Sequence, residues 1–271
     1  MTTLVTGGTG LVGSRLLRRF VEAGIETRGL VRPGKELPAG VTAVEGDILD
    51  PATLPAALDG VTDVVHLAAL FRTPDEEQIW RVNRDGTHNL ITAVQQAAPG
   101  ARLIMASTGN VYTAALTHPA REDDPLSPWA AYPASKIEAE AELRASGLNW
   151  GIIRLPFVYG DQDGHLEALP KMAADRGWHP ARRLSMAHHA DIAAAFQLAL
   201  TGTFDGRIVN VTDETAPSIY EVAQLLGEEY PSSGEPLEDP WQGQMDAGLA
   251  RSLGFRATVP SVYAAARDGR V

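Results

Sequence analysis

The chain has 271 residues, a formal net charge of −11 and no cysteine. The acidic balance argues against a nucleic-acid partner, which needs a basic face, and the lack of thiols excludes disulfides and cysteine-ligated metals. No apolar run approaches the length of a membrane span, and no signal-peptide pattern precedes the first expected strand. We therefore expect a cytoplasmic protein with no membrane partner.

Short apolar runs alternate with helix-compatible segments through the first two-thirds of the chain, which is typical of a parallel sheet wrapped by helices. Strands are predicted over residues 3–6, 27–31, 42–45, 63–67, 102–106 and 150–154, with 207–211 joining the same sheet later. Apolar residues at spacings of three and four predict helices over residues 14–23, 89–98 and 136–146.

A glycine-rich turn follows the first predicted strand. It fits G-x-x-G-x-x-G when counted from Gly7, and G-x-G-x-x-G when counted from Gly8. Glycines allow a tight turn and a close approach of the backbone to a pyrophosphate, and the next helix presents free N–H groups there. The turn therefore predicts a dinucleotide site on a Rossmann-type, doubly wound parallel α/β sheet. The expected cofactor-binding residues of this turn are Gly7, Thr9, Gly10, Leu11 and Gly13.

The regular alternation stops after Gly160, where loop-rich sequence with many prolines begins. We assign residues 1–160 and 186–212 to the NAD(P)-binding Rossmann domain. Residues 161–185 and 213–271 are assigned to a small, mostly C-terminal substrate-binding lobe.

The end of the second predicted strand carries Arg32 where an NAD-binding protein is expected to have an acidic residue for the ribose 2′-hydroxyl. A guanidinium suits a 2′-phosphate through paired hydrogen bonds. NADP is therefore favoured over NAD. The alternatives are that Arg32 is a solvated surface charge, or that it stacks on the adenine without selecting the phosphate.

Tyr132 and Lys136 lie four residues apart, so one helix would carry both on the same face. A nearby ammonium lowers the pKa of a phenol from about 10, which would let Tyr132 act as a general acid or base at a carbonyl or alcohol. Ser107 and Thr108 stand at the end of the fifth strand, at the sheet edge where α/β proteins bind ligands. Either hydroxyl could bond the reacting oxygen.

Several motifs occur in a fixed order: Gly7-x-x-Gly10-x-x-Gly13, Gly46-Asp47-Ile48, His66-Leu67-Ala68-Ala69, Val82-Asn83-x-x-Gly86-Thr87-x-Asn89, Ser107-Thr108-x-x-Val111-Tyr112, Tyr132-x-x-x-Lys136 and Arg154-x-x-x-Val158-Tyr159-Gly160. With them the chain resembles the extended short-chain dehydrogenase/reductase superfamily, in its NAD(P)-dependent epimerase/dehydratase group, over residues 2–212.

The resemblance implies a role for each matching position. Tyr132 would be the acid/base, Lys136 would bind the nicotinamide ribose and tune Tyr132, and Thr108 would be the catalytic Ser/Thr. Further cofactor contacts are implied for Asp47 and Ile48 at the adenine, for Leu67, Ala68 and Ala69 along the ribose and pyrophosphate, for Asn83 as an organiser of that site, and for Pro156 and Val158 at the nicotinamide amide. No metal site is expected, and the resemblance suggests a homodimer through the helices over 89–98 and 136–146.

The chain departs from the family pattern in three places. Gly109 and Asn110 stand where sugar-nucleotide dehydratases carry an acidic pair, which disfavours elimination. Phe157 stands where enzymes of nucleotide sugars often have Asn, and only about 85 residues remain for recognising a substrate. Trp129 and Trp178 are candidates for the pocket wall, although core packing explains either.

Two other polar groups are open to more than one interpretation. The segment His188-His189-Ala190-Asp191 resembles the base of the family's substrate lobe. For His188 a structural role is favoured over contact with the substrate. A metal site is the least favoured interpretation of the two histidines. Arg182 and Arg183 either bind a substrate phosphate or carboxylate, or form a solvated surface pair.

Three functions are consistent with these residues. The first is an NAD(P)H-dependent ketone reductase or alcohol dehydrogenase acting on a small-molecule substrate, favoured by Arg32, Phe157 and the small lobe. The second is a nucleotide-sugar epimerase that retains NAD. The third is a non-catalytic NAD(P)-sensing protein, although such proteins commonly lose the Tyr–Lys pair that is present here.

Overall fold

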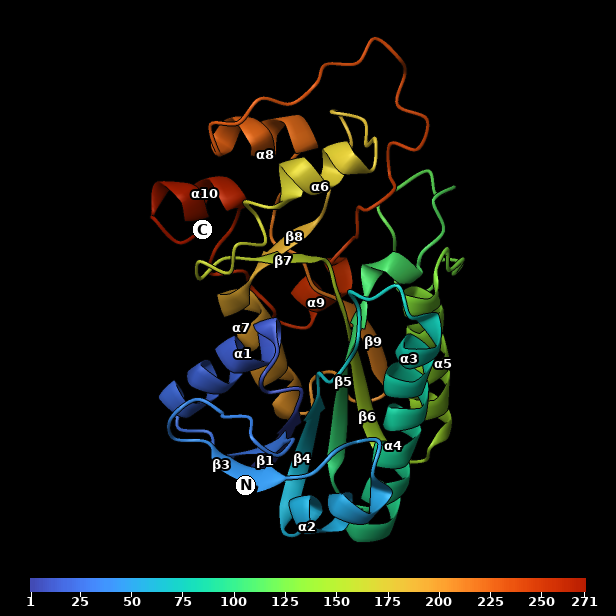
Figure 1. Cartoon of the computed structure of the whole chain (residues 1–271), viewed down its shortest axis with the longest axis vertical. Helices are drawn as coiled ribbons and strands as arrows, with labels where there is room; N and C mark the ends of the chain where they lie inside the picture. The colour runs from blue at the N-terminus through green and yellow to red at the C-terminus, as the bar shows by residue number, and fades with distance from the viewer.

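The computed structural model describes residues 1–271 and is built on one seven-stranded sheet (Figure 1). The strand order is β3-β2-β1-β4-β5-β6-β9, and every neighbouring pair is parallel. The strands are β1 (Thr2–Thr6), β2 (Thr27–Val31), β3 (Thr42–Glu45), β4 (Val61–His66), β5 (Arg102–Thr108), β6 (Asn149–Leu155) and β9 (Arg207–Asn210). The predicted Rossmann-type fold is confirmed, because this is the order of a doubly wound sheet.

Helices cover both faces of the sheet. On one face lie α1 (Leu11–Glu22) and α7 (His189–Leu200); on the other lie α2 (Leu54–Leu58), α4 (Gly86–Ala97) and α5 (Ala131–Ala145), with α3 (Glu76–Trp80) packed beside α5. Successive strand residues point to opposite faces, so Leu4 joins the α4/α5 core while Val5 joins the α1/α7 core. Burial on both faces explains why the central strands are apolar throughout.

All three predicted helices begin earlier than their apolar stripes indicated, and α4 begins at Gly86 rather than at residue 89. Helix α1 begins at Leu11, inside the glycine turn, because Gly10 is extended and acts as its N-cap. It ends as expected before Gly24, whose φ of +71° suits a C-terminal cap. Helix α5 begins at Ala131 rather than at residue 136, since Pro133 is tolerated in a first turn, where its missing N–H is not needed. Tyr132 and Lys136 therefore do share one helix.

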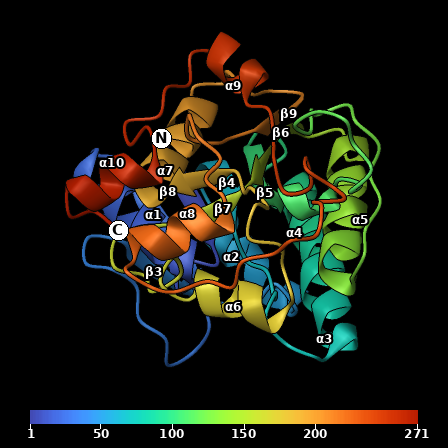
Figure 2. The same ribbon diagram turned by 90° about the horizontal axis from the view of Figure 1, so that it is seen from above.

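A smaller lobe lies at the end of the sheet where β6 leads into β7 (Figures 1 and 2). It contains the parallel pair β7 (Phe157–Tyr159) and β8 (Met186–His188), and the helices α6 (Leu169–Asp175), α8 (Ile219–Leu225) and α10 (Val262–Arg267) around their own apolar core. The connecting single turns are η1 (Pro51–Thr53), η2 (Arg81–Asp85) and η3 (Gly109–Val111).

Strands β7 and β8, at the junction between the sheet and the lobe, contribute side chains to the cores of both. Val158 and Ala187 pack into the α1/α7 core, whereas Tyr159 and Met186 pack into the lobe. Helix α9 (Gly248–Ser252) also packs on the α1/α7 core, although it lies in the stretch that was assigned to the lobe. The domain boundaries proposed from the sequence therefore stay a prediction.

No helix is both long enough and apolar enough to cross a membrane. No group of three or more His, Cys, Asp or Glu residues is arranged so that it could hold a metal ion.

Candidate active site

The glycine turn between β1 and α1 has the geometry that a pyrophosphate site requires. Gly7 has a φ of +74°, and a Cβ there would lie 2.5 Å from the backbone nitrogen of Ala68. A Cβ at Gly13 would lie 2.1 Å from the carbonyl oxygen of Gly7, so this glycine lets α1 pack against the turn. Thr9 and Leu11 are exposed at the start of the helix, where its free N–H groups are presented. The cradle fits a dinucleotide phosphate.

Gly13→Ala is expected to weaken dinucleotide binding at least tenfold and to destabilise the protein by about 1–3 kcal/mol, because the clash is with backbone that must shift. Isothermal calorimetry with NADH and NADPH, together with thermal unfolding, checks both effects. Gly100→Ala is the matched control, since a Cβ at Gly100 meets no atom within 4 Å. Equal affinities for the two variants would contradict the assignment.

The predicted adenine residues follow the ends of β2 and β3. Arg32 is exposed at the tip of β2, and Asp47 and Ile48 follow β3. The two ends are tied together by a hydrogen bond from the Gly46 N–H to the Val31 carbonyl oxygen (2.9 Å). The structure thus brings all three predicted residues to one end of the sheet.

The predicted ribose segment, Leu67 to Ala69, follows β4 and lies against the glycine turn. Asn83 is fully buried behind it: its Oδ1 accepts from the Leu70 N–H (2.7 Å), and its Nδ2 donates to the Leu70 carbonyl (2.9 Å) and to Ser135 Oγ (3.1 Å). Asn83 therefore links the segment after β4 to α5. The role in organising a cofactor site that the resemblance implies for Asn83 stays a prediction.

His66 at the end of β4 is a buried, neutral link beneath this segment. Thr87 donates its hydroxyl proton to the Asn83 carbonyl, so Thr87 Oγ1 accepts from His66 Nε2 (2.9 Å) and His66 Nδ1 accepts from Thr6 Oγ1 (2.6 Å). Burial, and then the charge of Lys136, lower the pKa of His66 to about 3. His66 is therefore uncharged at neutral pH and orients the glycine turn rather than exchanging protons.

Tyr132 and Thr108 lie side by side where β5 ends and α5 begins, and Lys136 lies one helical turn further along α5. Lys136 is 2% exposed, and burial lowers its pKa to about 8 while Glu140, one turn further along α5, raises it. Burial raises the pKa of Tyr132 to about 12, and the adjacent Thr108 hydroxyl opposes that rise. The lowered phenol pKa expected from the sequence is thus not what the protein groups alone produce, because desolvation outweighs the Thr108 hydrogen bond.

Of the two candidate hydroxyls at the end of β5, Thr108 is the one beside the Tyr132 phenol. Its Oγ1 also accepts from the Asn110 N–H (3.2 Å) and caps η3. Ser107 lies on the opposite face of the strand, where its Oγ is buried without a hydrogen-bond partner. The two hydroxyls therefore cannot serve the same oxygen.

A buried ion pair that sequence reasoning missed supports this centre. Arg154 on β6 donates to both carboxylate oxygens of Glu140 (2.7 and 3.1 Å), and each side chain is at most 4% exposed. Arg154 also donates to Tyr112 Oη (2.9 Å), which in turn donates to Asn210 Oδ1 (2.7 Å). The pair joins α5, β6 and β9 beneath Lys136. Arg154 and Tyr112 were recognised only as motif members, because their partners come from distant segments.

The predicted nicotinamide residues Pro156 and Val158 lie at the crossing from β6 to β7. Between them, the ring of Phe157 stacks on the ring of His165, with centroids 4.2 Å apart and planes at 23°. His165 Nδ1 donates to the Val158 carbonyl (2.7 Å). Phe157, which stands where enzymes of nucleotide sugars often have Asn, is therefore covered on one face by the His165 ring.

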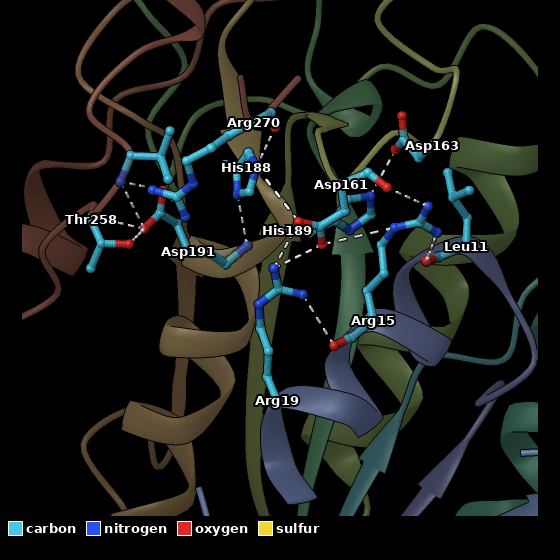
Figure 3. Close-up of polar contacts among 12 residues, drawn as sticks. Leu11, Arg15, Arg19, Asp161, Asp163, His188, His189, Asp191, Thr258 and Arg270 are labelled. Atoms are coloured by element: carbon cyan, nitrogen blue, oxygen red, sulfur yellow. Dashed lines mark hydrogen bonds and ion pairs between the residues drawn. The ribbon is translucent and has the colours of Figure 1, made fainter. Parts of the chain in front are cut away.

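The loop after β7 is held on α1 by charged groups (Figure 3). Arg15 donates to the Asp161 carbonyl (3.1 Å) and Arg19 to the Asp161 carboxylate (2.9 Å). Asp161 and Gln162 both have a φ of +54°, which is uncommon outside glycine. These contacts hold the loop in place over the helix that begins at the glycine turn.

The two adjacent histidines have separate structural partners in the same region (Figure 3). His188 Nδ1 accepts from the Ala190 N–H (3.0 Å) and its Nε2 donates to the Arg270 carbonyl (2.9 Å), while His189 donates to the buried Asp163 carboxylate (2.7 Å). Asp191 accepts from Thr258 N–H and Oγ1 (2.6 and 2.7 Å). The segment 188–191 therefore connects the lobe to the sheet.

The other candidate binding residues, two arginines and two tryptophans, lie in different parts of the structure. Arg183 donates to the Ala216 carbonyl (2.7 Å) on the surface, and the Arg182 guanidinium stacks 4.1 Å from the centroid of the Trp178 ring, beside the core of the lobe. Trp129 is the one that lies in the same hollow as Tyr132.

A sequence model of the NAD-dependent epimerase/dehydratase family matches residues 3–211. The chain belongs to this family. It is 31% identical to the dTDP-6-deoxy-L-talose 4-dehydrogenase of Kitasatospora kifunensis, over 93% of this chain and 89% of that protein. It is 29% identical to the 4-hydroxy-2-methyl-3-oxo-4-farnesyl-3,4-dihydroquinoline-1-oxide ketoreductase of Stigmatella aurantiaca, over 98% and 84%.

Among solved structures, the UDP-glucose 4-epimerase of Thermus thermophilus in complex with NAD matches with a TM-score of 0.77, at 25% identity and 98% coverage of both chains. The predicted family, the Rossmann-type fold and the class of NAD(P)-dependent dehydrogenase, reductase or epimerase are confirmed by these similarities.

Proposed function

We propose that this member of the family is an NAD(P)-dependent reductase or dehydrogenase that acts on a carbonyl or a secondary alcohol. The observation that carries the proposal is the contact of Tyr132 with Thr108, with Lys136 one turn further along the same helix, in a chain whose glycine turn has the shape that a dinucleotide requires. Phe157 stacked on His165, and the absence of an acidic pair after Thr108, favour simple hydride transfer over elimination on a sugar nucleotide.

The mechanism assigns one task to each residue. The bound nicotinamide supplies or takes up the hydride. Tyr132 gives its phenolic proton to the carbonyl oxygen, or takes it back in the oxidation of an alcohol. Thr108 holds that oxygen, and the Lys136 ammonium stabilises the phenolate that remains. The cofactor would be held by Gly7, Thr9, Gly10, Leu11 and Gly13 at the phosphates, by Arg32, Asp47 and Ile48 at the adenosine, and by Leu67–Ala69, Pro156 and Val158 along the rest.

The decisive experiment follows absorbance at about 340 nm with NADPH or NADH and a panel of carbonyl compounds. Steady loss of absorbance that disappears in Tyr132→Phe supports the proposal. Failure with every class of carbonyl would overturn it.

A nucleotide-sugar epimerase with retained NAD is the second candidate, supported by the similarity to the UDP-glucose 4-epimerase structure. It predicts that NAD co-purifies and that no cofactor is consumed, and calorimetry with UDP-glucose tests it. A non-catalytic NAD(P) sensor is the third, and the retained Tyr132 and Lys136 argue against it.

For the cofactor we propose NADP over NAD, because Arg32 is exposed at the tip of β2 and forms no ion pair with the carboxylates of this chain. Arg32→Ala is expected to raise the KM for NADPH about tenfold and to leave the KM for NADH within about twofold, since one charge-assisted contact is worth about 1.5–3 kcal/mol. Initial rates with each cofactor measure this. An equal effect on both would show that Arg32 does not select the phosphate.

Carbonyl reduction is expected to slow as the pH rises through about 8. Lys136 has its pKa lowered to about 8 and carries the stabilising positive charge only below that value. The pH profile of kcat between pH 6.5 and 9.5 measures the effect, and Lys136→Arg should remove the decline because guanidinium stays charged. A flat wild-type profile would refute the role given to the ammonium.

We further propose a homodimer formed through α4 and α5, as the family resemblance suggests. Native mass spectrometry of the purified protein tests it and also shows which dinucleotide co-purifies. The cytoplasmic location expected from the sequence stays a prediction.

A further inference from the structure

Two large aromatic side chains lie exposed beside Tyr132. Phe71, in the segment after β4, is 45% exposed, and Trp129, just before α5, is 68% exposed. Side chains of this size are mostly buried in proteins, and exposed apolar groups gathered in one place mark a binding surface. Both residues line a single hollow that also contains Tyr132.

The wall of this hollow is apolar close to the acid/base residue. The Phe71 ring lies 4.5 Å from the Tyr132 ring, centroid to centroid, at an angle of 47°. Ile79 of α3 and Pro133 of α5 extend the same wall. A ring placed here would contact aromatic faces, which gain from tilted or offset packing in addition to the area they bury.

The charges at the hollow have opposite signs. Glu76 comes from α3 on the sheet side, and Arg176 comes from the end of α6 on the lobe side. The Arg176 guanidinium lies over the Trp178 ring, 5.5 Å from its centroid. The Arg72 guanidinium also lies over the Phe71 ring, 5.9 Å from its centroid. These charges lie around a lining that is more than half apolar, so the contact offered to a substrate ring is the aromatic surface.

The part of a substrate that the hollow itself holds is small. Its volume is about 210 Å³, below the roughly 300–1,000 Å³ typical of pockets for drug-sized ligands. It accommodates one ring with a short substituent, and because it is open to solvent, a larger molecule would extend beyond it.

We propose that the substrate is a compact ketone with a ring-bearing apolar body, or the corresponding secondary alcohol, which packs against Phe71 and Trp129 while its carbonyl reaches Tyr132. This inference rests on the proposed function and names its substrate class. In the reduction, the carbonyl carbon gains a hydride from NAD(P)H and the oxygen gains the proton of Tyr132. The products are the secondary alcohol and NAD(P)⁺, and Tyr132 regains a proton from solvent.

The test compares acetophenone, which has a ring, with acetone, which has none, using the purified protein and NADPH or NADH. The expected kcat/KM is about 100-fold higher for acetophenone. Trp129→Ala should raise the KM for acetophenone about tenfold with little change in kcat, and should raise the KM for acetone much less, because acetone has no ring to pack against the indole. Tyr220→Ala is the matched control, because Tyr220 is also an exposed aromatic residue but lies on α8, in a separate hollow.

The outcomes separate this inference from the proposed function. Equal kcat/KM values for the two ketones, or an equal loss for both in Trp129→Ala, overturn the inference and leave the proposed reductase intact. If no carbonyl is turned over, the proposed function fails. In that case calorimetry of acetophenone binding to wild type and to Trp129→Ala decides the inference separately: binding that the variant weakens supports the apolar surface, and no difference overturns it.

Discussion

Tyr132→Phe is expected to lower kcat for carbonyl reduction by about 10³-fold while leaving the binding of NADPH within about twofold. Loss of a positioned general acid costs about 10²–10⁴-fold, and the substituted ring keeps its packing against Phe71. Single-turnover absorbance measurements at about 340 nm give the rate, and calorimetry gives the cofactor affinity.

The control for this variant is its stability. The Tyr132 phenol makes one hydrogen bond, with the Thr108 hydroxyl, so the free energy of unfolding of Tyr132→Phe should lie within about 1.5 kcal/mol of the wild-type value. A variant that stays folded, binds cofactor and retains more than a tenth of the wild-type kcat would show that another group donates the proton.

Arg154→Leu is expected to destabilise the protein by about 3–5 kcal/mol, because it leaves the Glu140 carboxylate buried without its partner. Denaturant unfolding measures the free energy. The double variant Glu140→Leu/Arg154→Leu should recover a large part of that loss, since no charge is then left unpaired. A loss below about 1 kcal/mol in the single variant, or no recovery in the double variant, would contradict the role of the pair.

The double variant lacks Glu140, whereas Arg154→Leu retains it, so the two variants should differ in the pKa of Lys136. Glu140 raises the pKa of Lys136, against the effect of burial, so removing Glu140 should shift the alkaline decline of kcat toward lower pH. A variant that only loosened the packing would lower the rate without moving the profile.

Much of the sheet could be predicted because the patterns that indicate it lie among residues close together in the chain. A strand buried on both faces must be apolar throughout, as in Val64 and Val65, and a glycine such as Gly13 has no substitute where helix and turn touch. Tyr132 and Lys136 could be paired from their spacing alone. These features depend on residues close together in the chain.

The features that could not be predicted depend on distant contacts. The short strands β7 and β8 pair across a long insertion, and the hollow beside Tyr132 combines Phe71, Trp129 and Arg176 from three separate segments. The pKa of Tyr132 without cofactor depends on such contacts as well: a sequence shows a lysine four residues away but not that burial raises the phenol pKa to about 12.

The attachment of Asp161 to α1 has a consequence for how two ligands would affect each other's affinity. Arg15 and Arg19 lie in the helix that follows the glycine turn, where we propose that the dinucleotide phosphates bind, and they hold the loop that leads into the lobe. A cofactor that stiffens the start of α1 therefore also steadies the lobe, which contributes Arg176 to the hollow beside Tyr132. Because coupling between two binding sites is reciprocal, we expect each ligand to tighten the other. The Kd of each ligand should then fall by the same factor when the other ligand is bound, which calorimetry of each ligand in the presence of the other measures.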